Sequence, residues 1–180
     1  MPVHIALLRA INVGGHKPVA MTDLRDLLAD LGLRDGRSLL QTGNLVFRSD
    51  ARKSGPLETL LETEAARRLD LHTDVFVRSA DEWAAIIDRN PFPAEADRDP
   101  GHLVVMFLKT AAAAADVEAL RAAINGREVV RTDGRQAYIV YPDGIGRSKL
   151  TTTLVERKLR TRGTARNWNT VTKLGALAEP

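Results

Sequence analysis

The chain has 180 residues, of which 44% are hydrophobic and 27% charged, as is typical of a soluble globular protein. It contains no cysteine, which excludes disulfides, thiol catalysis and thiolate metal sites. No apolar run approaches the roughly 20 residues that a membrane-spanning helix needs, and the N-terminus lacks a basic segment and a cleavage site. We therefore expect a cytoplasmic protein with no membrane partner.

The first half of the chain predicts the order β-α-β-β-α-β followed by an additional helix. Val3–Ile11 is nearly all apolar and rich in branched side chains, as in a buried strand. A leucine stripe between residues 24 and 31 marks one face of a helix that Gly32 ends. The other predicted elements are strands 38–41 and 45–48, helix 56–69, strand 73–78 and helix 79–90.

The same order is predicted again after residues 91–101, whose three prolines and charged residues indicate a linker. The elements are strand 102–109, helix 114–124, strands 127–131 and 136–141 around an Asp-Gly turn, helix 148–159, strand 164–167 and helix 170–178. We therefore predict an α+β fold, a duplicated ferredoxin-like α-β plait with an extra helix after each copy. The predicted parts are a first plait over 1–90, a linker over 91–101 and a second plait over 102–180. The opening strand of each copy is apolar on both sides, so we expect the second face of at least one sheet to be covered, by the other copy, by an extra helix or by another subunit of a homo-oligomer.

Basic residues are concentrated near the C-terminus. Residues 147–173 contain eight lysines and arginines but a single acid, Glu156, whereas the whole chain carries only +3. One interpretation is an electrostatic footprint for phosphate groups of a nucleotide or nucleic acid. The other is a solvated helix face in a chain that is rich in arginine throughout.

Four motifs occur in a fixed order along the chain: LLRAINVGGHKPVAMTDLRDLLADLGL, SLLQTGNLVF, GRSKLTTTLVERKL and TARNWNTVTKL. In this respect the sequence resembles the bacterial DUF1697 family, which has no assigned function. The resemblance spans essentially the whole chain and implies a duplicated α-β plait. It implies no catalytic residue, and the catalytic residues, if there are any, are unknown.

The loop NVGGHK supplies the first candidate ligand-binding residues: Asn12, Gly14, Gly15, His16 and Lys17. Its spacing matches neither G-x-G-x-x-G nor G-x-x-x-x-G-K-[ST]. The loop either binds a small anion or phosphodiester through backbone N–H groups, His16 and Lys17, or is a demanding turn that Asn12 stabilises.

The turn QTGN adds Gln41 and Asn44 as candidates, either as a polar rim beside the NVGGHK loop or as ordinary turn residues around Gly43. The sequence leaves open whether this turn and the loop meet.

Two C-terminal segments provide the remaining candidates. Ser148 is a candidate N-cap, with Arg147 and Lys149 available to an anion at the same helix end. In the segment RNWN, Trp168 could stack on a nucleobase with polar neighbours at the edge of the base, or seal the core before a helix capped by Asn169. The candidates in the RNWN segment are Arg166, Asn167, Trp168 and Asn169.

Several activities are not indicated by the sequence. The strands lack the aromatic pattern of RNA-recognition motifs, and the four histidines have no metal-ligand spacing, so no metal or cofactor is expected. Three hypotheses remain. The first is a binding module for a phosphate-bearing ligand. The second is an enzyme on a small anionic metabolite, with His16 or Lys17 as acid/base and Arg147, Lys149 or Arg166 as anion clamp. The third is a structural or oligomerisation domain.

Overall fold

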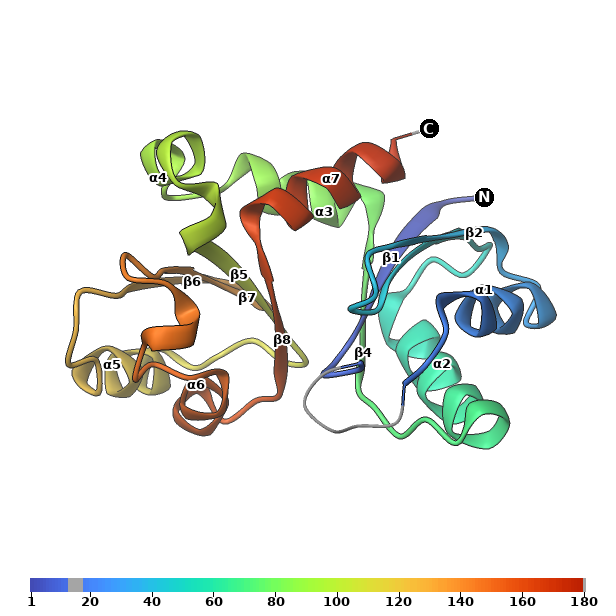
Figure 1. Ribbon diagram of the computed structural model, residues 1–180, viewed down its shortest axis with the longest axis horizontal. Helices are drawn as coiled ribbons and strands as arrows, with labels where there is room; N and C mark the ends of the chain where they lie inside the picture. The colour runs from blue at the N-terminus through green and yellow to red at the C-terminus, as the bar shows by residue number, and fades with distance from the viewer. Residues whose placement is uncertain (13–17, 180) are drawn as a thin grey trace. The chain divides into compact units, whose positions relative to one another are not determined.

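The computed structural model describes residues 1–12 and 18–179 of the chain. This part contains seven α-helices and two four-stranded sheets, in which every pair of neighbouring strands is antiparallel (Figure 1). The fold is therefore mixed α+β. None of the described helices is both long enough and apolar enough to cross a membrane.

The chain divides into two compact units, Met1–Ala85 with Lys173–Pro180 and Ile86–Thr172. The first unit holds a sheet of order β2-β3-β1-β4. Its elements are β1 (Val3–Leu8), α1 (Met21–Asp30), β2 (Arg34–Leu39), β3 (Asn44–Arg48), α2 (Ser54–Leu69), β4 (Val75–Ser79) and the first part of α3 (Ala80–Asp88). Helices α1 and α2 cover one face of this sheet, where leucines of both helices pack on Ala6, Leu45 and Val77 (Figure 1).

The second unit holds a sheet of order β6-β7-β5-β8. Its elements after α3 are α4 (Pro93–Arg98), η1 (Pro100–His102), β5 (Leu103–Leu108), α5 (Ala114–Ala122), β6 (Val129–Asp133), β7 (Gln136–Val140), η2 (Ile145–Arg147), α6 (Thr152–Leu159), β8 (Gly163–Asn167) and the first part of α7 (Trp168–Ala178). Helices α5 and α6 lie on the same face of the sheet (Figure 1), and Leu120 and Val155 pack there on Met106 and Ile139.

The predicted order of elements is confirmed, with local corrections at residues 91–101, at β2 and at α6, which begins at Thr152 and not at residue 148. Residues 91–101 contain α4 and most of η1, because Pro93 occupies the first turn of a helix, where the missing N–H is no loss. Strand β2 begins four residues earlier than predicted. Its residues are largely exposed and polar, so no alternation marks it in the sequence. The division of the chain at residues 91–101 stays a prediction.

Both faces of each central strand are buried, as the continuous apolar runs predict. All six residues of β1 and all six of β5 are buried. Ile5 and Leu7, which point away from α1 and α2 by strand alternation, are at most 1% exposed. Arg78 of β4 faces the same way and is only 2% exposed.

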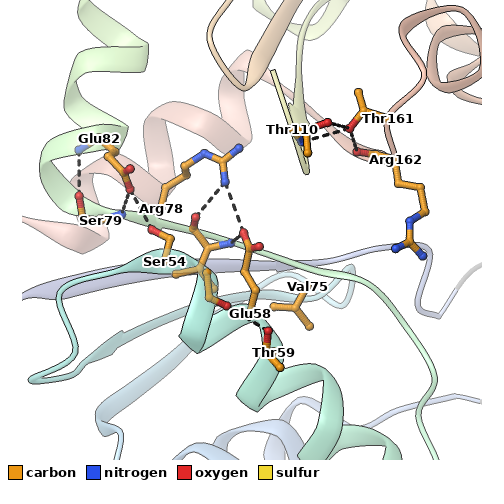
Figure 2. A network of polar contacts seen from close by, with 12 residues as sticks. Ser54, Glu58, Thr59, Val75, Arg78, Ser79, Glu82, Thr110, Thr161 and Arg162 are labelled. Atoms are coloured by element: carbon orange, nitrogen blue, oxygen red, sulfur yellow. Dashed lines mark hydrogen bonds and ion pairs between the residues drawn. The ribbon is translucent and has the colours of Figure 1, made fainter. Parts of the chain in front are cut away.

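Three glutamates of α2 and α3 bind the outer edge of β4, and Figure 2 labels two of them, Glu58 and Glu82. The N–H groups of Val75, Val77 and Ser79 donate to the carboxylates of Glu62, Glu58 and Glu82, at 2.9, 2.9 and 2.7 Å. An edge strand otherwise presents such groups to other chains as a template for pairing. The carboxylates therefore satisfy the edge of β4 within its own unit.

His4 of β1 is a buried imidazole that should make stability depend on pH. Its Nε2 lies 3.0 Å from the carbonyl of Ala51, so Nε2 carries the proton, while the buried Nδ1 has no partner among the described residues. Burial lowers the pKa of His4 below its ordinary value, opposed more weakly by the Ala51 hydrogen bond and the charge of Glu82.

The unfolded chain therefore binds a proton at His4 more readily than the folded chain does. We expect the free energy of unfolding to fall as the pH drops below about 6.5, by at most about 1.4 kcal/mol per pH unit from this group. Urea denaturation of wild type and His4→Phe at pH 7.5 and 5.5 measures the effect. Equal pH dependence in the two proteins would show that His4 makes no such contribution.

Candidate functional site

Asn12 closes the loop that follows β1. Its Nδ2 donates to the carbonyls of Val19 at 2.9 Å and Gln41 at 2.8 Å, and its Oδ1 accepts from the N–H of Val19 at 2.6 Å. The backbone of Asn12 has a φ of 53°, a left-handed conformation that asparagine tolerates better than most residues. The other candidates of this loop, Gly14, Gly15, His16 and Lys17, lie outside the described residues.

The bond from Asn12 to Gln41 also shows that the turn between β2 and β3 meets the base of this loop. Buried Asn44 donates from Nδ2 to the carbonyl of Leu39 at 2.8 Å and to Thr42 Oγ1 at 3.0 Å. Gly43 has a φ of 83°, and a Cβ placed there would lie 2.8 Å from the Cδ1 atom of Ile11. The amides of Asn12 and Asn44 therefore hold the local backbone together.

Ser148 is not the N-cap of α6, contrary to the sequence prediction. Thr151 caps this helix, accepting from the N–H of Leu154 at 3.1 Å. Ser148 Oγ instead donates to Glu128 Oε1 at 2.6 Å and accepts from the N–H of Leu150 at 3.0 Å. Arg147 and Lys149, on either side of Ser148, are exposed.

The RNWN segment is divided between β8 and α7. Asn167, rather than Asn169, caps α7, because its Oδ1 accepts from the N–H of Thr170 at 3.0 Å. Helix α7 begins at Trp168, so Asn169 lies in its first turn. Trp168 is only 7% exposed, which favours its role in sealing the core over that of a stacking platform.

Arg166 is a partly buried cation in β8. It donates to Thr164 Oγ1 at 2.7 Å and to the carbonyl of Ala165 at 2.9 Å. Burial lowers the pKa of Arg166 to about 10, so it stays protonated at neutral pH. It pairs with Val105 of β5 as Arg78 of β4 pairs with Ile5 of β1, so arginines occupy matching positions in the two sheets.

A basic hollow of about 550 Å³ lies in the second unit at the end of β5. One wall consists of one face of α6 and the residue that follows this helix, Arg160. The other wall consists of the residues that follow β5, Lys109 and Thr110, and the paired residues that precede β8, Thr161 and Arg162. The residues that line this basic hollow are Lys109, Thr110, Thr153, Glu156, Arg157, Arg160, Thr161 and Arg162. Four of the eight are cations and one is an acid.

Hydrogen bonds fix the backbone beneath these cations. Lys109 N–H donates to the carbonyl of Arg162 at 2.9 Å, so the two residues are paired across the sheet. Thr161 Oγ1 accepts from the N–H of Thr110 at 3.1 Å and lies 3.0 Å from Thr110 Oγ1 (Figure 2). Arg160 ends α6 with a φ of 54°.

The charge of the basic hollow is only partly balanced. Arg160 lies 3.5 Å from Asp116, but its side chain is 81% exposed, and an ion pair in that setting contributes little. Arg157 also lies in the last turn of α6, where a cation interacts favourably with the helix dipole. Lys109 and Arg162 extend from the ends of strands. Together the four cations can attract an anion.

The first unit has a hollow at the equivalent position, at the end of β1 and between α2 and β4, but its residues carry a different charge. This mixed hollow, of about 530 Å³, is lined by Arg9, Ala10, Ile11, Asp70, Leu71, His72, Thr73 and Asp74. Arg9 N–H donates to the carbonyl of Asp74 at 3.0 Å, as Lys109 does to Arg162. Acids of this hollow pair with its own basic groups: Arg9 lies 3.6 Å from Asp74, and His72 3.1 Å from Asp70.

The basic hollow was not predicted as a site from the sequence. The basic segment 147–173 includes Arg157, Arg160 and Arg162, but the predicted ligand contacts were Arg147, Lys149 and Arg166. The missing information was the pairing of Lys109 with Arg162, which joins segments about fifty residues apart. The described residues contain no group of three or more His, Asp or Glu side chains that could hold a metal ion.

Comparison with known proteins places the chain among proteins without an assigned activity. The sequence profile of a family described as "Protein of unknown function (DUF1697)" matches residues 1–138. A solved structure, that of the conserved bacterial protein SP0830 from Streptococcus pneumoniae, is similar with a TM-score of 0.74 over 99% of both chains, at 24% identity. That likeness concerns the fold alone. No curated protein matches the chain.

Proposed function

This chain belongs to the DUF1697 family of proteins of unknown function, and we propose that it is a binding module for a phosphate-bearing ligand, a nucleotide or a nucleic acid. The observation that carries the proposal is the basic hollow, which Lys109, Arg157, Arg160 and Arg162 line together with three threonines and one glutamate. Arginine and lysine bind phosphate oxygens through charge-assisted hydrogen bonds. Arg147 and Lys149 are further candidate contacts.

The enzyme hypothesis finds less support. Its acid/base candidates, His16 and Lys17, lie outside the described residues, and one of its clamp residues, Arg166, is partly buried and bonded to its own strand. The polar residues Asn12 and Asn44 serve local structure, as the third hypothesis expects of them. That hypothesis does not account for the basic hollow.

We also propose that each unit is a ferredoxin-like plait and that the chain is a duplication of it. The support is the strand order, in which the first and third strands are central and the second and fourth lie at the edges of each sheet. Matching hollows, and arginines at matching positions of the two sheets, agree with a common origin of the two units. A cytoplasmic location stays a prediction.

Charge reversal in the basic hollow tests the proposed function. We expect Arg157→Glu with Arg160→Glu to weaken binding of a fluorescein-labelled 20-nucleotide DNA at least tenfold in 50 mM salt, because two attractive contacts become repulsive. Fluorescence anisotropy measures the dissociation constant. ATP and tripolyphosphate, used as competitors, report binding of small phosphates at the same place.

The matched control is Arg52→Glu with Lys53→Glu, two exposed cations of the first unit whose replacement changes the net charge by the same amount. We expect this pair to weaken binding less than twofold. A third pair, Arg147→Glu with Lys149→Glu, tests the candidates nominated from the sequence. Equal losses in the hollow and control variants, or no binding of any of the three probes by the wild type, would refute the proposal.

A further inference from the structure

The lining of the basic hollow indicates which kind of phosphate compound it suits. All eight described lining residues are polar or charged. Sites for small molecules enclose most of their ligand. Here Thr110, Thr153, Arg157, Arg160 and Arg162 are exposed, so the hollow is shallow and leaves a bound group open to water.

The lining also has no aromatic platform for a base. Bases are commonly held by stacking on aromatic side chains, and none of the eight lining residues is aromatic. Trp168, the aromatic candidate nominated from the sequence, is buried. A mononucleotide bound here would therefore be held by its phosphates alone, with its base and sugar in solvent.

The basic hollow and the mixed hollow carry residues of opposite charge at equivalent positions of the two units. Asp74 and Arg162 each pair with the residue that follows the central strand of their sheet, Arg9 or Lys109. Asp70 ends α2 and Arg160 ends α6, each in a left-handed conformation, with φ of 50° and 54°. Acids thus stand in the first unit where arginines stand in the second, and only the second hollow has an excess of cations.

From these observations we propose that the basic hollow of the second unit binds the phosphodiester backbone of a nucleic acid without reading its bases, and that the mixed hollow of the first unit does not bind it. This inference rests on the proposed function and narrows it from phosphate compounds in general to polymers. A polymer passes through a shallow hollow and places neighbouring phosphates against separate cations. A mononucleotide presents its phosphates at one point.

A length series tests this inference. We would compete the labelled 20-nucleotide DNA with AMP, ATP, tripolyphosphate and unlabelled oligonucleotides of 6, 12 and 24 nucleotides, all at equal phosphate concentration. We expect the 12-mer to compete at least 30-fold better than ATP, and dA12 and dT12 to differ by less than threefold. With three or four phosphate contacts, a fourfold increase in salt should weaken single-stranded DNA binding about 20- to 50-fold. Comparison of the dissociation constants of single-stranded DNA, duplex DNA and RNA of equal length shows which type of nucleic acid the basic hollow prefers.

The variants separate this inference from the proposed function. Asp70→Arg with Asp74→Arg should create a second basic hollow and strengthen binding of the 24-mer, whereas Arg160→Asp with Arg162→Asp should abolish competition by the oligonucleotides. Circular dichroism checks that each variant is folded. If ATP or tripolyphosphate competes as well as the 12-mer, or if dA12 and dT12 differ more than tenfold, the inference is wrong and the proposed function stands. If no phosphate compound binds, both are wrong.

Discussion

Replacing Glu58 by alanine is expected to lower the free energy of unfolding by about 3 kcal/mol, because the change removes the acid of a buried ion pair. Glu58 and Arg78 are 7% and 2% exposed, and Arg78 NH1 lies 3.6 Å from Glu58 Oε1. The same carboxylate accepts from the N–H of Val77 on the edge of β4 (Figure 2). The variant therefore takes the carboxylate from a buried guanidinium and leaves a strand N–H without its acceptor.

Glu62→Ala is the matched control, since Glu62 lies one turn later on α2 and accepts from the N–H of Val75 on the same strand edge. We expect it to cost about 1 kcal/mol, the value of an ordinary hydrogen bond. Urea denaturation at pH 7 measures both. Glu58→Gln keeps an acceptor for Val77 and should fall between the two. Equal costs for Glu58→Ala and Glu62→Ala would mean that the ion pair contributes nothing beyond the strand hydrogen bond.

Trp168→Ala should cost about 3–5 kcal/mol, the range observed for truncation of large buried aromatic side chains. Trp168 is 7% exposed and begins α7, next to its cap residue Asn167. A structural role predicts that Trp168→Phe, which keeps much of the apolar surface, costs less than half as much. It also predicts that DNA binding is unchanged in whichever variant remains folded.

Thermal or urea denaturation, followed by anisotropy titration of the folded variant, separates the two interpretations of Trp168. If Trp168→Ala kept its stability and lost DNA affinity at least tenfold, the tryptophan would be a reader of bases. In that case the basic hollow would not be the whole binding site.

The secondary structure could be predicted where side-chain periodicity was strong. Leu24, Leu27 and Leu28 mark α1 correctly, and the apolar runs of β1 and β5 identify strands that are buried on both faces. Prediction failed where a strand or helix lacks a hydrophobic pattern. Strand β2 is an exposed edge strand without alternation, and α4 begins at a proline that can be mistaken for a linker signal.

The caps and the candidate site were harder to predict, for different reasons. Ser148, Thr151, Thr152 and Thr153 are all acceptable N-cap residues, so composition alone cannot select Thr151. The basic segment could be recognised from the sequence. Which of its cations lie together in the basic hollow depends on the alignment of β5 with β8, which brings Lys109 beside Arg162. Spacing along one chain carries no information about that alignment.

The most direct test of the central claim, that the basic hollow binds phosphate groups, is the change in ¹⁵N amide chemical shifts on titration with tripolyphosphate. The account predicts saturable shifts at Lys109, Thr110, Thr161 and Arg162, and none at Arg9 or Asp74 of the mixed hollow. Shifts that centre on the mixed hollow, or that leave the residues of the basic hollow unchanged at millimolar tripolyphosphate, would contradict it.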